Sequence, residues 1–202
     1  MNILRLCKNA AAAAGLSIAL MHAPANAAVD FNANANPVAL ANGTILSGGY
    51  SFSSGSSIGV VDGDSYTTLG VNNHTPMLVF NNAGQVTVTQ IGGGLFSLGS
   101  LDVGGWLNLQ NNTAQLNIVG HTLSGDQFAF SPLLSTTTFA HVTLSPLFTN
   151  LTSLTLSMTG YTSSAYAAVD NLTLAPVPEP ETYALLLAGL GLLAVAARRR
   201  KA

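Results

Sequence analysis

The middle of the chain lacks positive charge. The 202 residues include six Lys and Arg, all of them near the ends, at Arg5, Lys8 and residues 198–201. Residues 28–177 contain no cation and six Asp, which gives this stretch a formal charge of −6. Since it cannot neutralise phosphates, we expect no nucleic-acid binding. A buried acid in this stretch must be hydrogen-bonded, protonated or bound to a metal, because no Lys or Arg can pair with it.

Cysteine is almost absent as well. The single cysteine, Cys7, lies in the N-terminal segment. The remainder of the chain can therefore form no disulfide, no thiolate metal site and no cysteine nucleophile.

The N-terminal segment has the order of a secretory signal peptide. Arg5 and Lys8 form a short basic region, residues 10–21 are mostly apolar, and the small-residue motif A-N-A ends at Ala27. This order is typical of signal peptides, so we predict a signal peptide over residues 1–27, cleaved after Ala27. An apolar run of this length is too short for a comfortable membrane span.

Short alternating segments occupy residues 37–174, after a polar lead-in or edge segment at 28–38. Residues 86–91, 139–144 and 153–160 alternate apolar with Ser, Thr or His, which predicts strands with one buried face. Gly, Asn, Asp and Pro separate these and similar runs. The similar runs are 44–53, 66–71, 76–80, 95–103, 115–120, 126–130 and 167–174. Short strands at regular spacing, without helical periodicity, predict an all-β domain, which we take to be an antiparallel β-sandwich over residues 28–175.

The apolar positions of these segments predict the core of the sandwich. Ser, Thr and Asn are left for the polar faces, so we expect a neutral surface rich in hydrogen-bonding groups. The predicted core residues are Val86, Val88, Phe96, Leu98, Leu101, Trp106, Leu116, Ile118, Phe128, Phe130, Val142, Leu144, Leu154, Leu156, Leu172 and Leu174.

Three features follow one another at the C-terminus. They are the box Pro178-Glu179-Pro180, the uncharged run 182–197 and the basic cluster Arg198, Arg199, Arg200 and Lys201. As a helix the run would be about 24 Å long, against a hydrocarbon core of about 30 Å. The basic cluster favours the cytoplasmic side of a membrane. We therefore predict a short transmembrane helix with a basic stop, because a buried core helix would not explain the cluster.

This C-terminal arrangement resembles the PEP-CTERM sorting signal of Gram-negative bacteria. In that family a membrane protease-transpeptidase, exosortase, is thought to process the protein near the motif. The resemblance implies that residues 176–202 are a sorting signal and that exosortase is a partner. It also implies export, with an inner-membrane intermediate and a final place at the cell surface or outside the cell.

The body resembles those of other PEP-CTERM proteins more weakly. The similar segments are 92–103, 116–128, 147–157 and 168–174. The resemblance implies a jelly-roll-like sandwich and no particular activity.

A calcium site is one hypothesis for the acids of the body. Asp170 lies in the last predicted strand, and oxygen ligands without nearby cations suit calcium. Asp30 would join Asp170 if the first and last strands pair, so we predict one structural calcium at these two residues. The alternative is that Asp170 hydrogen-bonds to backbone at a strand bend.

No catalytic residue is predicted. Ser57 occupies the nucleophile position of a G-x-S-x-G match, but no helix is expected after it, as that motif requires. His74, His121 and His141 match no zinc spacing. Glycoside hydrolysis needs two carboxylates. Asp62 with Asp64, or Asp102 with Asp126, could supply them, although Asp in D-G-D is a common turn residue.

Aromatic residues beside neutral hydroxyl and amide groups suit carbohydrate recognition. The candidates are Tyr50, Phe52, Tyr66, Trp106, Tyr161 and Tyr166. Trp106 is better explained as a core residue, whereas Tyr161 and Tyr166 flank a Ser-rich loop and are preferred for stacking.

The function predicted from these features is non-catalytic. We expect a secreted or surface-associated protein linked to an extracellular polysaccharide matrix, such as that of a biofilm, and able to bind glycans. One alternative is a structural or adhesive protein that self-assembles through edge strands. A small hydrolase is the third.

Overall fold

The computed structural model describes residues 27–32, 41–66, 70–107, 114–160, 165–178 and 180–199. The chain divides into two compact units. One comprises residues 26–177 and is called the body here; the other joins residues 1–25 with 178–202. Each unit is described by itself.

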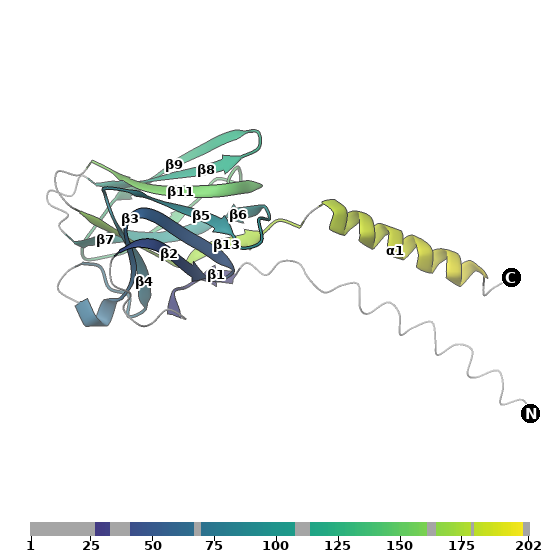
Figure 1. Cartoon of the computed structure of the whole chain (residues 1–202), viewed down its shortest axis with the longest axis horizontal. Helices are drawn as coiled ribbons and strands as arrows, with labels where there is room; N and C mark the ends of the chain where they lie inside the picture. The colour runs from purple at the N-terminus through teal and green to yellow at the C-terminus, as the bar shows by residue number, and fades with distance from the viewer. Residues whose placement is uncertain are drawn as a thin grey trace, which may run out of the picture. The chain divides into compact units, whose positions relative to one another are not determined.

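Thirteen strands occur in the described part of the body (Figure 1). They are β1 Ala27–Val29, β2 Ala41–Ser47, β3 Tyr50–Asp62, β4 Pro76–Asn81, β5 Gln85–Gln90, β6 Phe96–Leu98, β7 Ser100–Leu107, β8 Gln115–Thr122, β9 Gly125–Leu133, β10 Ala140–Thr143, β11 Leu151–Thr159, β12 Tyr166–Asp170 and β13 Leu172–Pro176. Every pairing is antiparallel. The prediction of an all-β sandwich is confirmed.

The sheet curls into two layers because the long strand β3 belongs to both. Its first half pairs with β5, and its second half pairs with β4. One layer runs in the order β2, β3, β5, β11, β8 and β9. The other continues from β4 through β12 and β7 to β10. The short strands β1, β13 and β6 connect to β11 along one edge.

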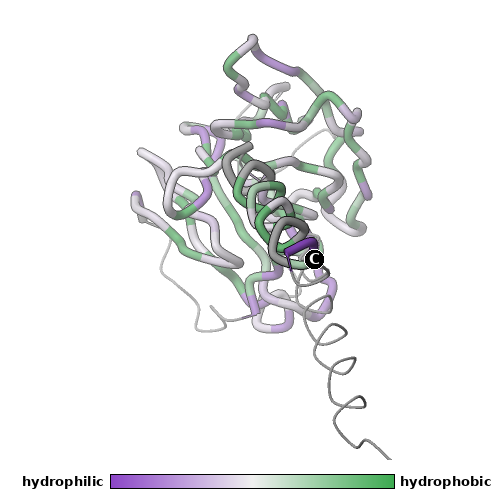
Figure 2. Tube along the Cα trace, turned by 90° about the vertical axis from the view of Figure 1, so that its right-hand side faces the viewer, coloured by the Kyte–Doolittle hydropathy of each residue, from purple (hydrophilic) through white to green (hydrophobic). Residues whose placement is uncertain are grey.

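The main core lies between the layers and follows the alternation of the strands. Figure 2 shows apolar residues recurring along the strands of the body. Fourteen of the sixteen predicted core residues are buried. Phe128 and Phe130 are the exceptions, with 65% and 60% of their surface exposed, so their prediction as core residues is wrong. In β9 it is Ala129 that packs against the core, while the phenylalanines point to solvent.

A second apolar cluster covers the outer side of the other layer. Val61, Met77, Val79 and Ala168 meet Trp106 there, and Val71 packs on them from the segment that follows the 3-10 helix Gly63–Tyr66. The strand predicted over 66–71 is therefore wrong where the structure describes it. The backbone N–H of Val71 donates to the carbonyl of Gly105 and fixes this segment against β7.

The strand predicted over 167–174 is broken into β12 and β13. Asn171, at the break, has φ of 50°, a left-handed conformation that Asn tolerates better than most residues. The break lets β12 pair with β4 and β7 while β13 pairs with β1 and β6. The end strands thus pair, with Val29 opposite Leu172.

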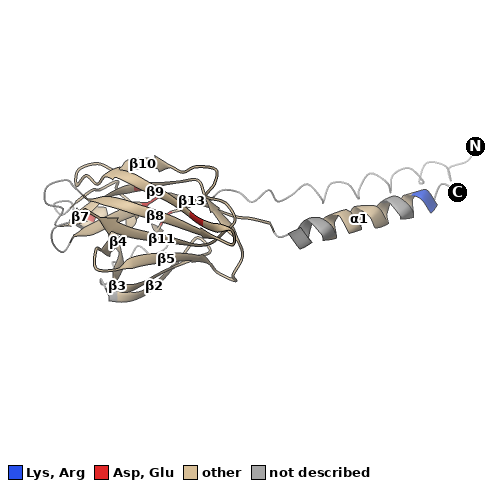
Figure 3. Ribbon diagram, turned by 90° about the horizontal axis from the view of Figure 1, so that it is seen from above, with Lys and Arg blue, Asp and Glu red and all other residues tan. Residues whose placement is uncertain are grey.

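Helix α1, Pro180–Arg199, follows the body. Arg198 and Arg199 lie in its last turn and are the blue residues of Figure 3, in which the described body carries only acidic charge. By length and hydropathy, no helix among the described residues qualifies as membrane-spanning. The prediction of a transmembrane helix is therefore not confirmed.

Candidate functional site

The solvent side of the layer from β2 to β9 is a polar surface, which we call the Ser/Thr face. One row of side chains crosses all six strands, as the cross-strand pairings show. It consists of Thr44, Ser53, Thr87, Thr155, Val119 and Phe128. Because neighbouring strands lie about 4.8 Å apart, the row is about 24 Å long.

Two further rows flank this one. Gln85, Ser157, Asn117 and Phe130 are successive partners on β5, β11, β8 and β9. On the other side, Ser153 on β11 pairs with His121 on β8, which pairs with Asp126 on β9. The face therefore combines hydroxyl and amide groups, and its aromatic rings and one acid lie together on β9.

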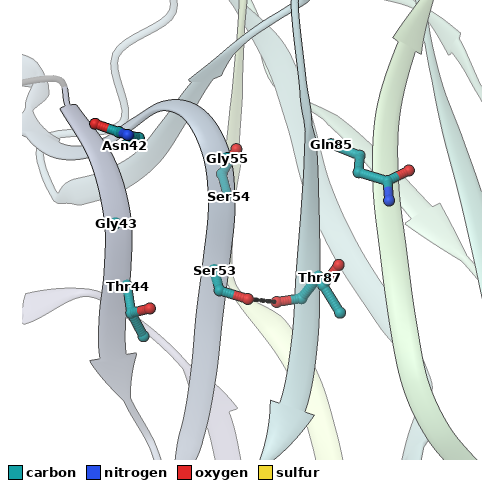
Figure 4. Close-up of a pocket in the computed structure, with 8 residues that line it drawn as sticks. All are labelled: Asn42, Gly43, Thr44, Ser53, Ser54, Gly55, Gln85 and Thr87. Atoms are coloured by element: carbon teal, nitrogen blue, oxygen red, sulfur yellow. Dashed lines mark hydrogen bonds between the residues drawn. The ribbon is translucent and has the colours of Figure 1, made fainter.

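The β2 side of the face is hollowed. The hollow has a volume of about 450 Å³. The residues that line it, drawn in Figure 4, include neither an aromatic nor a charged side chain. Its lining residues are Asn42, Gly43, Thr44, Ser53, Ser54, Gly55, Gln85 and Thr87. The Ser53 hydroxyl donates to the carbonyl of Thr87 at 3.3 Å, which ties β3 to β5 across the floor.

A second hollow continues the first along the turn between β4 and β5. It has a volume of about 400 Å³ and shares Gln85 with the first hollow. Ser157 of β11 also lines it. The concave part of the Ser/Thr face thus reaches from β2 to β11.

The aromatic part of the face lies on its edge strand, β9. Phe128 stands opposite Val119 and Phe130 opposite Asn117, so both rings project from the same side as the polar rows. Side chains two residues apart in a strand share a face, which places Asp126 on this side as well. In the sequence, Phe128 and Phe130 are two residues apart, which places both rings on one face of a strand. The sequence does not show whether that face is buried or exposed.

His121 links three strands of the face through its two ring nitrogens. Nδ1 lies 2.9 Å from Oδ1 of Asp126 on β9, and Nε2 lies 2.9 Å from the hydroxyl of Thr155 on β11. A carboxylate only accepts hydrogen bonds, so Nδ1 donates to Asp126. In the neutral ring, Nε2 then accepts the proton of the Thr155 hydroxyl.

Two other histidines also bind an aspartate. His74 Nδ1 lies 2.6 Å from Asp64, which Asn72 also contacts. These hydrogen bonds, first from Asn72 and then from His74, lower the pKa of Asp64. His141 Nδ1 lies 2.7 Å from Asp102, next to β12. Asp102 and Asp126 therefore bind different histidines.

Asp170 is a fully buried acid at the end of β12. Its Oδ2 accepts hydrogen bonds from Asn73 at 2.7 Å and from the Thr75 hydroxyl at 2.9 Å, and its Oδ1 accepts one from the N–H of Asn171. Burial raises the pKa of Asp170, and these hydrogen bonds partly offset the effect. The bond to Asn171 matches the alternative given above, an Asp that hydrogen-bonds to backbone where the strand bends.

The predicted calcium site remains a prediction. The end strands pair as it requires, but the side chain of Asp30 is exposed and accepts a hydrogen bond from Asn32, whereas Asp170 is surrounded by neutral donors. Among the described residues, no group of three or more His, Cys, Asp or Glu could hold a metal. A melting temperature that rises with calcium and falls with a chelator would support the site.

The aromatics expected from the sequence lie elsewhere. Tyr50 and Phe52 are buried in the main core, where burial raises the pKa of Tyr50 to about 12. Trp106 is buried in the second cluster, as expected, with its ring edge-on to the partly buried Tyr166 at 5.7 Å between centroids. Tyr161 lies outside the described residues.

The other predicted sites have the following places. Ser57 lies inside β3, without the strand-to-helix turn of a nucleophile elbow. Asp62 accepts hydrogen bonds from the N–H of Asp64 and from Ser65, as a turn residue does.

The residues predicted for processing and sorting lie at the two ends of the chain. Ala27 begins β1, and cleavage after it stays a prediction. Glu179, Arg200 and Lys201 lie outside the described residues.

Comparison with known proteins identifies the C-terminal segment. A family model described as the PEP-CTERM protein-sorting motif matches residues 176–201. The resemblance given by the box, the apolar run and the basic cluster is therefore confirmed. No curated protein matches the chain.

Solved structures that match the chain include carbohydrate-binding modules. A family 29 module is 16% identical, covers 68% of this chain and 88% of its own, and has a TM-score of 0.38. The module TmCBM61, in complex with β-1,4-galactotriose, is 8% identical, with coverages of 64% and 90% and a TM-score of 0.40. A family 11 module from Clostridium thermocellum is 12% identical, with coverages of 70% and 98% and a TM-score of 0.35. Similarity at this level says nothing about a ligand of this chain.

Proposed function

We propose that this chain, whose residues 176–201 carry a PEP-CTERM sorting motif, is an exported, non-catalytic protein that binds extracellular polysaccharide on its Ser/Thr face. The chain is held at the inner membrane during export, and an exosortase-type enzyme processes it near Pro178. The body then acts at the cell surface or in the surrounding matrix.

The observation that carries the proposal is the composition of the Ser/Thr face. Hydroxyl and amide side chains line its concave part, and two exposed phenylalanine rings stand on the strand at its edge. Sugars present apolar ring faces together with hydroxyl groups, and aromatic rings beside neutral hydrogen-bonding groups match both. A face about 24 Å long is suited to a polymer rather than to a single sugar.

The charge of the body limits which polysaccharides could bind to it. Residues 28–177 carry six Asp and no Lys or Arg. A polyanion would be repelled by this charge and would find no cation to bind. The proposed ligand is therefore a polysaccharide without acidic groups.

The test is retention of the chain by insoluble polysaccharides, with the double substitution Phe128→Ala and Phe130→Ala. Both rings are exposed, so stability should change by about 0.5 kcal/mol or less. Loss of two stacking platforms should weaken binding about tenfold or more, since aromatic contacts contribute about 0.5–1.5 kcal/mol each beyond the area they bury. Leu147→Ala is the matched control, because Leu147 is 64% exposed and lies outside the six strands of the face.

Two results would contradict the proposal. One is that no neutral or amine-bearing polysaccharide retains the chain. The other is that retention survives the loss of both phenylalanines.

Self-assembly is a second candidate, because β9 is an edge strand. In the described body β9 pairs only with β8, and it exposes Phe128, Phe130 and Leu133. An apolar edge strand of this kind can pair with another copy. Sedimentation velocity separates the two functions: a concentration-dependent increase in mass without glycan favours assembly, and a monomer at high concentration opposes it.

A further inference from the structure

The acid of the Ser/Thr face lies at its aromatic end. Asp126 is 45% exposed at its side chain and lies two residues before Phe128 on the same side of β9. His121 donates to Oδ1, while Oδ2 has no hydrogen-bond partner among the described residues. One carboxylate oxygen is thus held in place and the other remains open to a ligand.

The network behind Asp126 fixes its orientation. His121 holds the carboxylate from β8, and the Thr155 hydroxyl on β11 holds the other side of the imidazole ring. Thr155, which ends this series of hydrogen bonds, lies on a central strand, because β11 is paired with both β5 and β8. Its position is therefore rigid. A carboxylate placed in this way loses little conformational freedom when it binds a donor.

The group that this arrangement fits is a cation carried on a ring. The body contains no Lys or Arg that could neutralise Asp126. An ammonium group would form a charge-assisted hydrogen bond with the free oxygen. Its sugar ring would pack on the exposed face of Phe128, and the aromatic ring attracts the same positive charge.

We propose that Asp126, Phe128 and His121 form a subsite for a hexosamine unit with a free amine, within a polymer that the Ser/Thr face binds. The proposal rests on the function proposed above and names one class of its ligand, a glucosamine polymer that is at least partly deacetylated. Asp126 binds the ammonium group and Phe128 the ring, while His121 is a positioning residue for the carboxylate.

The other aspartate–histidine pairs lack these features. Asp64 receives hydrogen bonds from Asn72 as well as His74, and no aromatic ring accompanies it among the described contacts. Asp102 is mostly buried, and both of its oxygens are engaged, by His141 and by Asn171. Neither presents a free carboxylate oxygen beside an exposed ring.

Thr155, His121 and Asp126 also have the order of a hydroxyl–imidazole–carboxylate triad. Thr155, however, is buried in the middle of β11, with paired strands on both sides. An acyl-transfer reaction needs an accessible nucleophile and donors for an oxyanion. The geometry therefore fits support of Asp126 better than catalysis.

The test measures binding of the full chain to two probes of equal length, a chitosan oligosaccharide and its fully N-acetylated form. Mildly acidic buffer of low ionic strength keeps the amines charged. We expect the chitosan oligosaccharide to bind more tightly, and its affinity to fall steeply with added salt. Asp126→Asn should weaken its binding about tenfold and leave binding of the acetylated form within about twofold.

The matched control is Asp64→Asn, which removes an acid of similar exposure, 54% against 45%, that also has a histidine partner but lies outside the face. It should change neither affinity by more than about twofold. His121→Gln tests the positioning role: it should weaken chitosan binding less than Asp126→Asn does and leave the acetylated probe unaffected.

Other results would contradict either the amine subsite alone or the polysaccharide-binding function as well. If both probes bind equally, or if Asp126→Asn has no effect, the amine subsite is wrong. The polysaccharide-binding function then stands as long as Phe128→Ala with Phe130→Ala abolishes retention. If no glycan binds at all, the function fails and the subsite fails with it. If the β9 variants lose binding because they dimerise, β9 would serve in self-assembly rather than in glycan binding.

Discussion

At the scale of single residues, Asp170 shows how this body carries a buried acid without any cation. Its three hydrogen bonds come from neutral groups, namely the Asn73 amide, the Thr75 hydroxyl and the Asn171 N–H. Such bonds favour the charged form, whereas burial disfavours it more strongly, so the pKa is raised. The sequence predicted that any buried acid must be hydrogen-bonded, protonated or bound to a metal. The donors could not be identified from the sequence, because Asn73 and Thr75 are almost a hundred residues away from Asp170 along the chain.

The pKa of Asp170 leads to a prediction about Thr75→Val. Without the Thr75 hydroxyl, the pKa of Asp170 should rise further above its usual value near 4. An acid with a raised pKa in the folded state stabilises the fold below its unfolded pKa, and this contribution is lost as the pH rises through the folded pKa. We therefore expect Thr75→Val to cost about 1.5–3 kcal/mol at pH 7 and less at pH 3, because the lost hydrogen bond favours the charged form, which is less populated at the lower pH.

Urea unfolding of both proteins at the two pH values measures this difference. Thr143→Val, on the exposed side of β10, is the control and should change stability by about 0.5 kcal/mol or less at either pH. An equal loss at pH 3 and pH 7 would contradict the role of the Thr75 hydroxyl in holding the charge.

At the scale of elements, the positions of most strands could be predicted from the sequence, but the direction of β9 could not. Alternation marks two faces of a strand without saying which one is buried. In β9 the small residues Ala129 and Ser131 face the core, and the N–H of Leu116 on β8 donates to the Ser131 hydroxyl at 2.8 Å. This bond and the pairing with β8 set the register, and both depend on a neighbour that the alternation within β9 does not reveal.

The segment that covers the second cluster was also missed, because apolar side chains in 66–71 suggested a strand. It is held instead by close packing of Gly70 against β7. A Cβ on Gly70 would lie 2.3 Å from the backbone carbonyl oxygen of Trp106. Backbone cannot yield as a flexible side chain can, so the two segments would have to separate.

Gly70→Ala should therefore destabilise the body by about 1–3 kcal/mol. Gly55→Ala is the control, since a Cβ there meets nothing within 4 Å and its stability should stay equal or rise slightly. Thermal unfolding of the two variants measures the effect. Equal melting temperatures would show that Gly70 and Val71 are not packed on β7 as described.

At the scale of the whole molecule, the two units differ in charge: every Lys and Arg lies in the terminal segments, and the body has only acids. The cations lie in the terminal segments, where the sequence predicted a signal peptide and a sorting signal, and the motif over 176–201 confirms the second. The body, with its formal charge of −6, presents a hydroxyl- and amide-rich face with one acid at its aromatic end. The composition alone predicted a surface rich in hydrogen-bonding groups, but not the place of the acid. The proposal of a binding site on β9 required the fold, because the exposure of Phe128 and Phe130 does not follow from the sequence.

The central claim is that a glycan occupies the Ser/Thr face, and chemical-shift mapping by NMR tests it most directly. The labelled chain is titrated with a soluble oligosaccharide of the polysaccharide that retains it. We expect the largest shifts at Phe128, Phe130, Thr87 and His121, with little change at Trp106 and Tyr166 in the second cluster. Shifts concentrated at Trp106 and Tyr166, with β9 unaffected, would contradict it.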